Sequence, residues 1–146
     1  MLVGALMSKN VKTLERTASV KEAAQLMKEY MISSVLILDG DKVEGIVTDR
    51  DIICNIVAAD KQSSTVKVED IMTRNVIAVT DDMPIEEAAK IMTENKIKTL
   101  PVFSNGKLAG IITATDIVAS GVRLEETVLA SLANLFPVQR VSSVGS

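Results

Sequence analysis

The stretch Gly45-Ile-Val-Thr-Asp-Arg-Asp-Ile52 decides the fold, because it returns as Gly110-Ile-Ile-Thr-Ala-Thr-Asp-Ile117, 65 residues further along the chain. Each copy is predicted to be an apolar strand that ends on a threonine and turns directly into a helix. An aspartate follows the threonine three residues later. We call Thr48–Asp51 the first rim and Thr113–Asp116 the second rim. Each rim is expected to present free backbone N–H groups and one carboxylate.

Two interpretations of a rim compete. It can be a capping box, in which the threonine accepts the N–H three residues on and the aspartate accepts the N–H of the threonine. Such a cap stabilises any helix by about 0.5–2 kcal/mol and needs no ligand. It can also be a nucleotide site, because a helix N-terminus attracts phosphate and a carboxylate can accept both hydrogen bonds of a ribose diol. Two copies in register favour the nucleotide site.

The composition narrows the class of protein. The chain has 146 residues, enough for one domain or two small halves that share a core. Aromatic residues are limited to Tyr30, Phe103 and Phe136, so the core must consist of Val, Ile, Leu, Met and Ala. The net charge is −3 and the basic residues are dispersed, which argues against a nucleic-acid partner.

Histidine is absent and Cys54 is the single cysteine. An internal disulfide, an imidazole metal site and a histidine general base are therefore excluded. Cys54 lies in an apolar segment and is expected to be a small buried side chain rather than a nucleophile. The N-terminus is too short for a signal peptide, and no apolar run reaches the ~18 residues of a spanning helix. We expect a cytoplasmic protein without membrane insertion.

An internal repeat governs the whole chain. Residues 6–55 and 71–120 are identical at about 15 of about 50 positions, which indicates duplication of one structural unit. We expect a first repeat at 1–62, a second at 63–121, and a C-terminal helix with a flexible tail at 122–146.

Each repeat is predicted to contain the same elements in the same order. Ser19, with Glu22, is expected to cap a helix over Val20–Tyr30, and Asp82 with Pro84 is expected to do so in the second repeat. The expected elements are short extended pieces at 11–14 and 76–79, strands at 34–38, 42–48, 99–103 and 107–113, second helices at about 50–59 and 115–120, and a C-terminal helix at 123–135 followed by a disordered tail at 142–146.

Two further patterns leave alternatives open. The glycines at 45 and 110 interrupt a strand, which indicates a β-bulge or the close approach of another segment. An apolar stripe in each first helix indicates core packing or a helix–helix dimer contact. Its members are Val20, Ala23, Ala24 and Met27 in one repeat and Ile85, Ala88, Ala89 and Met92 in the other.

Over about residues 5–120 the chain resembles a tandem pair of cystathionine-β-synthase (CBS) domains. The resemblance is carried by Met-Ser/Thr-x-Asn-Val, Glu-Ala-Ala-x-x-Met, Leu100-Pro-Val102 and Gly-apolar-apolar-Thr-x-x-Asp-Ile, all but the third present in both repeats. It implies an α/β (α+β) fold, a Bateman-type module of two β-α-β-β-α units with pseudo-twofold symmetry. Two clefts between the units would bind AMP, ADP, ATP or S-adenosylmethionine.

The resemblance also implies the site residues. Asp51 and Asp116 would hold the ribose hydroxyls, and Thr48 and Thr113 would contact phosphate or ribose. Lys98-Thr99 and Ser33-Ser34 stand where AMP-sensing members carry His-Arg, so the two sites are expected to differ. The remaining residues expected around base and phosphate are Lys12, Thr13, Arg50, Ile77, Ala78, Pro101 and Thr115.

The function implied is that of a regulatory, energy-sensing module without catalytic activity or catalytic cofactor, acting on a separate partner protein. A dimerisation scaffold without ligand and an S-adenosylmethionine sensor are the alternatives. An enzyme is disfavoured because no acid/base or nucleophile constellation is evident. A homodimer through the alanine-rich helices is expected, with residues 123–135 docking on the core or on a second subunit.

Overall fold

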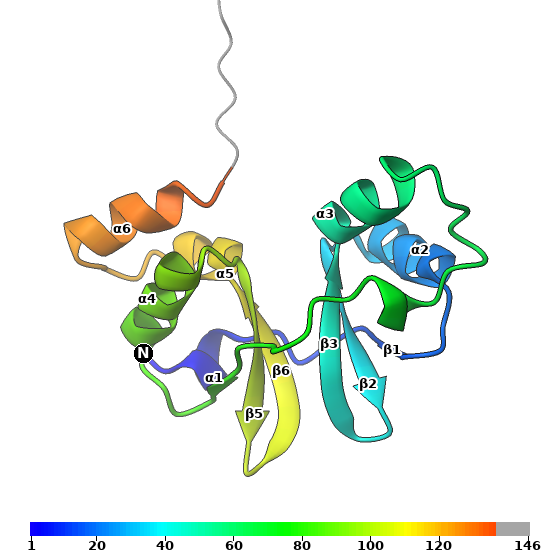
Figure 1. Ribbon diagram of the computed structural model, residues 1–146. Coiled ribbons are helices and arrows are strands. Elements are labelled where there is room, and N and C mark those ends of the chain that lie inside the picture. Colours follow the sequence, from blue (N-terminus) through cyan, green and yellow to red (C-terminus); the bar gives the residue numbers. More distant parts are fainter. Residues whose placement is uncertain (137–146) are drawn as a thin grey trace, which may run out of the picture. The chain divides into compact units, whose positions relative to one another are not determined.

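The structure, a computed structural model, describes residues 1–136 and has a mixed α/β architecture (Figure 1). The chain forms two compact units. Asn10–Ile77 make the first-repeat unit, and Met1–Lys9 together with the chain from Ala78 onward make the second-repeat unit. The predicted tail at 142–146 lies outside the described residues.

The first-repeat unit is built on a three-stranded sheet of order β1-β2-β3. β1 runs parallel to β2 because α2 carries the chain across between them, whereas β2 and β3 form an antiparallel hairpin. Its elements are β1 (Thr13–Glu15), α2 (Val20–Tyr30), β2 (Ser34–Asp39), β3 (Lys42–Thr48), α3 (Asp49–Ile52), a π-helical turn (Ile53–Val57) and a 3-10 helix (Val68–Asp70).

The second-repeat unit has the same topology, with sheet order β4-β5-β6. Its elements are α1 (Val3–Leu6), β4 (Val79–Thr80), α4 (Ile85–Asn95), β5 (Thr99–Ser104), β6 (Lys107–Thr113), α5 (Ala114–Ala119) and α6 (Glu126–Ala133). The predicted α/β fold class and the duplicated β-α-β-β-α order are therefore confirmed.

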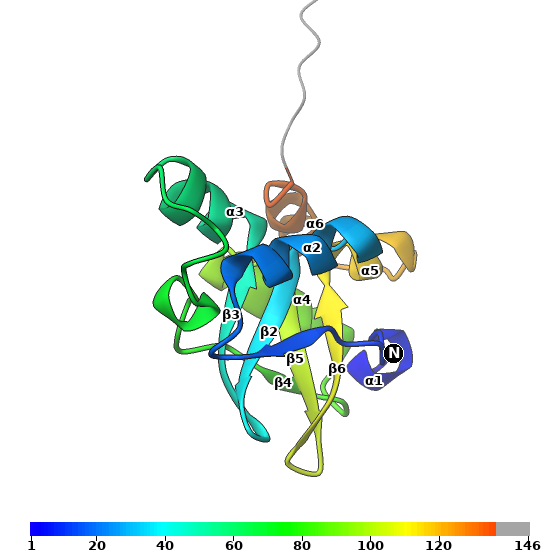
Figure 2. The same ribbon diagram turned by 90° about the vertical axis from the view of Figure 1, so that its right-hand side faces the viewer.

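The first stretch of each repeat joins the unit built mainly by the other repeat. Near the N-terminus, Ser8 and Ile111 exchange backbone hydrogen bonds of 2.8 and 2.9 Å, and α1 lies beside β6 (Figure 2). In the first-repeat unit, Thr73 and Ile46 exchange bonds of 2.8 and 3.0 Å in the same way. Each sheet thereby gains a short paired segment along the edge of its last strand.

Close approach explains the glycine in each of these edge strands. A Cβ on Gly45 would lie 2.5 Å from Met72 Sδ and 2.9 Å from the Thr73 carbonyl oxygen. On Gly110 it would lie 2.7 Å from the Ser8 carbonyl oxygen. The strand register also shifts one residue away from each glycine, as in a β-bulge. Both predictions for these glycines, the β-bulge and the close approach of another segment, are confirmed.

The apolar stripes of α2 and α4 face the cores of their own units, which confirms core packing. In α4, Ala88, Ala89 and Met92 are fully buried, whereas Ala24 and Met27 at the equivalent positions of α2 are half-buried. The two helices differ because α6 packs against α4 (Figure 1). Leu132 of α6 is completely buried in this contact. The C-terminal helix thus docks on the second-repeat core, one of the two expected outcomes.

Four local predictions are corrected. Pro84 is the N-cap of α4 and supplies no side-chain bond, and Asp82 does not cap, because its Oδ1 accepts the Thr80 hydroxyl at 2.6 Å. The helix expected from residue 50 to 59 becomes π-helical after residue 52. The helix expected over 123–135 spans Glu126–Ala133, since Glu125 is its N-cap and the preceding Leu124 packs against the core.

Cys54 is exposed, contrary to the predicted burial. Ile52 and Ile56, four residues apart, face the core. A residue two positions from each of them lies on the opposite side of the helical turn, so Cys54 points outward. Exposure alone gives this thiol no functional role.

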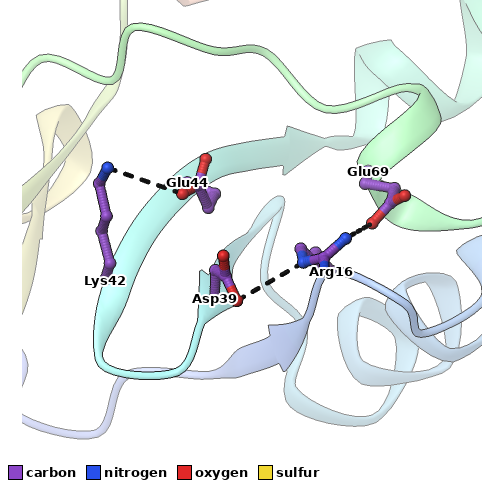
Figure 3. A network of polar contacts seen from close by, with 5 residues as sticks. All are labelled: Arg16, Asp39, Lys42, Glu44 and Glu69. Atoms are coloured by element: carbon purple, nitrogen blue, oxygen red, sulfur yellow. Dashed lines mark hydrogen bonds and ion pairs between the residues drawn. The ribbon is translucent and has the colours of Figure 1, made fainter.

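An ion-pair cluster fastens the 3-10 helix to the rest of the first-repeat unit (Figure 3). Arg16, which follows β1, donates to Glu69 Oε2 of the 3-10 helix at 3.0 Å and lies 3.5 Å from Asp39 Oδ1 at the end of β2. The hydrogen bond to Glu69 and the charge of Asp39 raise the pKa of Arg16, so its guanidinium stays charged. The cluster helps to hold the segment that leads to Thr73.

Candidate functional site

Both rims adopt the same geometry at the junction of the last strand and the following helix. In the first rim, the Thr48 N–H donates to Asp51 Oδ2 at 2.9 Å and the Asp51 N–H donates to Thr48 Oγ1 at 3.1 Å. Thr113 and Asp116 repeat these bonds at 2.9 and 3.1 Å. The capping-box interpretation of the rims is confirmed in both repeats. Both rims lie in a partly buried setting.

The prediction of free backbone N–H groups at the first rim is wrong. The Asp49 N–H donates to the Ser33 carbonyl oxygen at 2.9 Å, and the Arg50 N–H donates to the side chain of Asp49 at 2.8 Å. Thr48 takes the third N–H, that of Asp51, as described above. In addition, α3 is only four residues long. The start of this helix therefore has few unbonded N–H groups and a small dipole with which to bind a phosphate.

The second rim differs from the first at three positions that matter for anions, with Ala114, Thr115 and Lys98 in place of Asp49, Arg50 and Ser33. Its first helical N–H, that of Ala114, donates to the Lys98 carbonyl oxygen at 2.8 Å. Ala114 has no side-chain acceptor, so it cannot take the next N–H as Asp49 does. Lys98, an exposed residue, lies next to this rim, whereas the equivalent position of the first repeat is Ser33. Each rim therefore has one basic residue in or next to it, Arg50 or Lys98, but the second rim has no counterpart of Asp49 and is the less negative of the two.

The predicted strand-start residues do lie at the rims. Ser34 is the β-sheet partner of Thr48, and Thr99 is the partner of Thr113. Pro101 lies two residues further along β5, where it is buried and pairs with Ile111. Within each unit, sequence reasoning therefore identified a real group of neighbours.

Arg50 and Thr115 occupy the second position of their helices, and both residues are exposed. Ile77 and Ala78 are exposed and lie where the chain passes from one compact unit to the other. The part of all four residues in a ligand site stays a prediction.

Thr13 is the first residue of β1, and Lys12 immediately precedes it. The Lys12 carbonyl accepts the Leu36 N–H at 3.2 Å, and Thr13 pairs with the same residue. The Lys12 ammonium donates to Asn10 Oδ1 at 3.1 Å and lies 3.9 Å from the centre of the Tyr30 ring. This cation–π contact restrains the side chain on its own unit.

Thr73 is the rim neighbour that sequence reasoning missed. Its hydroxyl donates to Asp51 Oδ1 at 3.3 Å and Oδ2 at 3.4 Å, although 22 residues separate the two in the chain. A signal was present, because a hydroxyl residue, Ser8, stands at the equivalent position of the repeat.

Residues 1–136 contain neither a cluster of metal-ligating side chains nor a helix that could span a membrane. In residues 1–136 no three His, Cys, Asp or Glu side chains come together as a metal site would require. Nor does any helix of that range have the length and apolar character needed to cross a membrane.

Comparison with known proteins shows that the chain matches the model of one protein family in two places. Its model, CBS domain, matches residues 3–58 and again residues 68–122. An uncharacterised protein of Methanopyrus kandleri is 39% identical over 117 residues, which cover 79% of this chain and 60% of that protein. An uncharacterised conserved protein from Pyrococcus horikoshii has a similar crystal structure, with a TM-score of 0.75 and 33% identity, covering 85% of this chain and 95% of that one.

An enzyme is also among the relatives. The inosine-5'-monophosphate dehydrogenase of Korarchaeum cryptofilum is 39% identical over 110 residues, which cover 75% of this chain but 22% of the enzyme. The chain thus spans less than two thirds of both curated relatives named here. Because the match is confined to a small part of the dehydrogenase, it transfers no catalytic activity to this chain.

Proposed function

Because the chain belongs to the CBS-domain family and carries a pair of these domains, we propose that it is a regulatory module that binds an adenosine-containing ligand and acts on a separate partner protein. The observation that carries the proposal is the repeated, rim-held carboxylate of Asp51 and Asp116. We assign the ribose hydroxyls of AMP, ADP or ATP to these two side chains.

Capping and ribose binding are compatible. An ionised carboxylate offers about four lone-pair directions, and the capping box uses one of them. Ribose hydroxyls are donors, and a charged acceptor strengthens the bonds they form. The bonds from the Thr48 and Thr113 N–H groups also fix the orientation of each carboxylate before a ligand arrives.

We place the phosphate preference at the second rim. Lys98 adds a cation there, and Ala114 stands where the first rim has the competing carboxylate of Asp49. At the first rim Arg50 can offer a planar guanidinium, but Asp49 lies beside it. The other predicted residues are assigned to base, sugar or phosphate contacts, namely Lys12, Thr13, Ser33, Ser34, Thr48, Ile77, Ala78, Thr99, Pro101, Thr113 and Thr115.

A dimerisation scaffold without ligand is the second candidate. It is favoured by the capping boxes that occupy both rims, because they explain Thr48, Asp51 and their counterparts without any nucleotide. We also infer a homodimer through α2. Ala24 and Met27 of this helix are only half-buried, whereas α6 covers α4. Size-exclusion chromatography with light scattering tests the dimer, and a concentration-independent monomer would refute it.

A thermal-shift titration of the full chain tests the ligand. The probes are AMP, ADP, ATP and S-adenosylmethionine, with GMP as control. A ligand that binds only the folded state stabilises it by about 2.7 kcal/mol at 100 times its dissociation constant. We expect an adenosine probe to raise Tm, GMP to have no effect, and Asp51→Ala/Asp116→Ala to abolish the response.

The matched control is Glu22→Ala. Glu22 is the acidic member of the capping box at Ser19, so its loss removes the same kind of cap from a helix outside the rims. This variant should melt earlier yet keep the full ligand response. No shift of the wild-type chain with any adenosine probe would favour the scaffold.

A further inference from the structure

The contact between Thr73 and Asp51 adds to the first rim a residue that has so far been given no role in ligand binding. The Thr73 hydroxyl is shared between the two carboxylate oxygens, at 3.3 and 3.4 Å. These distances are long for an O–H···O bond, which is usually about 2.5–3.0 Å. The hydroxyl is therefore placed at the carboxylate without being tightly bound to it.

The backbone, rather than side-chain packing, holds Thr73 in place. Its N–H and C=O pair with Ile46, the residue after Gly45, and this pairing needs the close approach that the glycine allows. The preceding residue, Met72, is buried in the core of the unit, whereas Thr73 is exposed. A β-branched side chain on so fixed a backbone has few orientations.

The hydrogen-bonding capacity of the pair leaves room for a sugar. Asp51 accepts the Thr48 N–H at 2.9 Å and the weak bond from Thr73. Of about four lone-pair directions, about two then stay available for a diol. The Thr73 hydroxyl can also accept a bond from one sugar hydroxyl while it donates to Asp51, because a hydroxyl both donates and accepts.

The second-repeat unit has the same arrangement of backbone. Ser8 stands at the position equivalent to Thr73, and it pairs with Ile111 as Thr73 pairs with Ile46. Both positions therefore place a hydroxyl residue beside the strand that leads into a rim. This repetition is independent of the hydrogen bond seen at Asp51.

We propose that Thr73 is a positioning and specificity residue of the first rim, which orients the Asp51 carboxylate and contacts a hydroxyl of a bound ribose. The inference rests on the proposed function. It adds that the first rim distinguishes a ribose, with both its hydroxyls, from a deoxyribose.

Calorimetric titration with AMP and 2'-deoxy-AMP tests this inference in the full chain. Asp116→Ala serves as the parent, so that only the first rim retains its carboxylate. Adding Thr73→Val, which keeps the shape but removes the hydroxyl, should weaken AMP binding about tenfold, equivalent to about 1.4 kcal/mol. The preference for AMP over 2'-deoxy-AMP should fall at the same time. Thr73→Ser should restore both.

Thr93→Val is the matched control, because the Thr93 hydroxyl donates to the Lys90 carbonyl of its own helix at 2.9 Å. It should bind as the parent does. If Thr73→Val is poorly folded by circular dichroism, Thr73→Ala replaces it with the same expectation.

The outcomes separate the two proposals. If removing Asp51 abolishes binding but Thr73→Val leaves affinity and sugar preference unchanged, the inference on Thr73 is overturned and the proposed function stands. If Asp51→Ala in the same parent binds AMP normally, the assignment of ribose to Asp51 fails and the role of Thr73 fails with it. A parent that binds no AMP while the wild type does overturns the inference for the first rim alone, and a wild type that binds no adenosine probe overturns both.

Discussion

Gly45→Ala should destabilise the first-repeat unit by about 1–3 kcal/mol, the usual cost of inserting a methyl group into a closely packed site. The new Cβ would lie 2.5 Å from Met72 Sδ, 2.8 Å from Met72 Cγ and 2.9 Å from the Thr73 carbonyl oxygen. A side chain can move away from such a contact, but a backbone oxygen that accepts the Ile46 N–H can do so only by lengthening that bond.

Urea denaturation followed by circular dichroism measures the loss, and amide hydrogen exchange locates it. The amides of Ile46 and Thr73 should lose protection in Gly45→Ala. Gly40→Ala is the control, because Gly40 has a positive φ of 61° but a Cβ added there would meet no atom of residues 1–136 within 4 Å. It should cost stability through its backbone conformation and leave those two amides protected.

A double-mutant cycle tests the cause. Met72→Ala removes the two closest contacts, so Gly45→Ala should cost less in that background, with a coupling energy of about 0.5–3 kcal/mol. If Gly45→Ala instead unfolds at the wild-type urea concentration with Ile46 and Thr73 still protected, the account of the edge segment is refuted.

Three other perturbations test the remaining structure. Leu132→Ala should cost about 2–5 kcal/mol by urea denaturation, because Leu132 is fully buried where α6 docks, whereas Leu129→Ala, at a residue 47% exposed, should cost far less; equal effects would refute the docking. Arg16→Ala should lower the urea midpoint more at low salt than at about 1 M salt, because its two ion pairs are accessible to counterions; salt-independent loss would contradict an electrostatic role. Cys54 should react with a maleimide in the native protein at the rate of an accessible thiol, as followed by mass spectrometry, and protection until unfolding would contradict its exposure.

The features predicted well from the sequence are those that neighbours in the chain decide. Ser19 and Glu22 suffice to start α2, since both members of the capping box lie within one turn. The strands predicted at 99–103 and 107–113 join in a tight hairpin because Asn105 and Gly106 between them adopt positive φ, 52° and 77°. The rims are of the same kind, so their hydrogen bonds could be predicted to the residue.

The features that were missed depend on segments far apart in the chain. The N–H of Asp49 is taken by the carbonyl of Ser33 at the start of another strand, which no local pattern shows. The hydroxyl of Thr73 reaches Asp51 only because the segment that carries Thr73 pairs with the edge of β3. The docking of α6 on α4 was one of two alternatives that the sequence left open, because this helix has no counterpart in the first repeat.

The outward orientation of Cys54 was missed for a related reason. An apolar run indicates burial only when every face of the helix is covered, and here the core lies on the side of Ile52 and Ile56. Similarly, Asp82 looked like a cap because of its residue type, but its carboxylate is engaged by Thr80 two residues earlier.

A crystal structure of the chain grown with the adenosine probe that stabilises it most would test the central claim most directly. The account predicts that carboxylate oxygens of Asp51 or Asp116 lie about 2.5–3.0 Å from the ribose hydroxyls, with the bonds from the Thr48 and Thr113 N–H groups still in place. A nucleotide whose ribose contacts neither carboxylate, or crystals without bound nucleotide, would contradict it and leave both aspartates as helix caps.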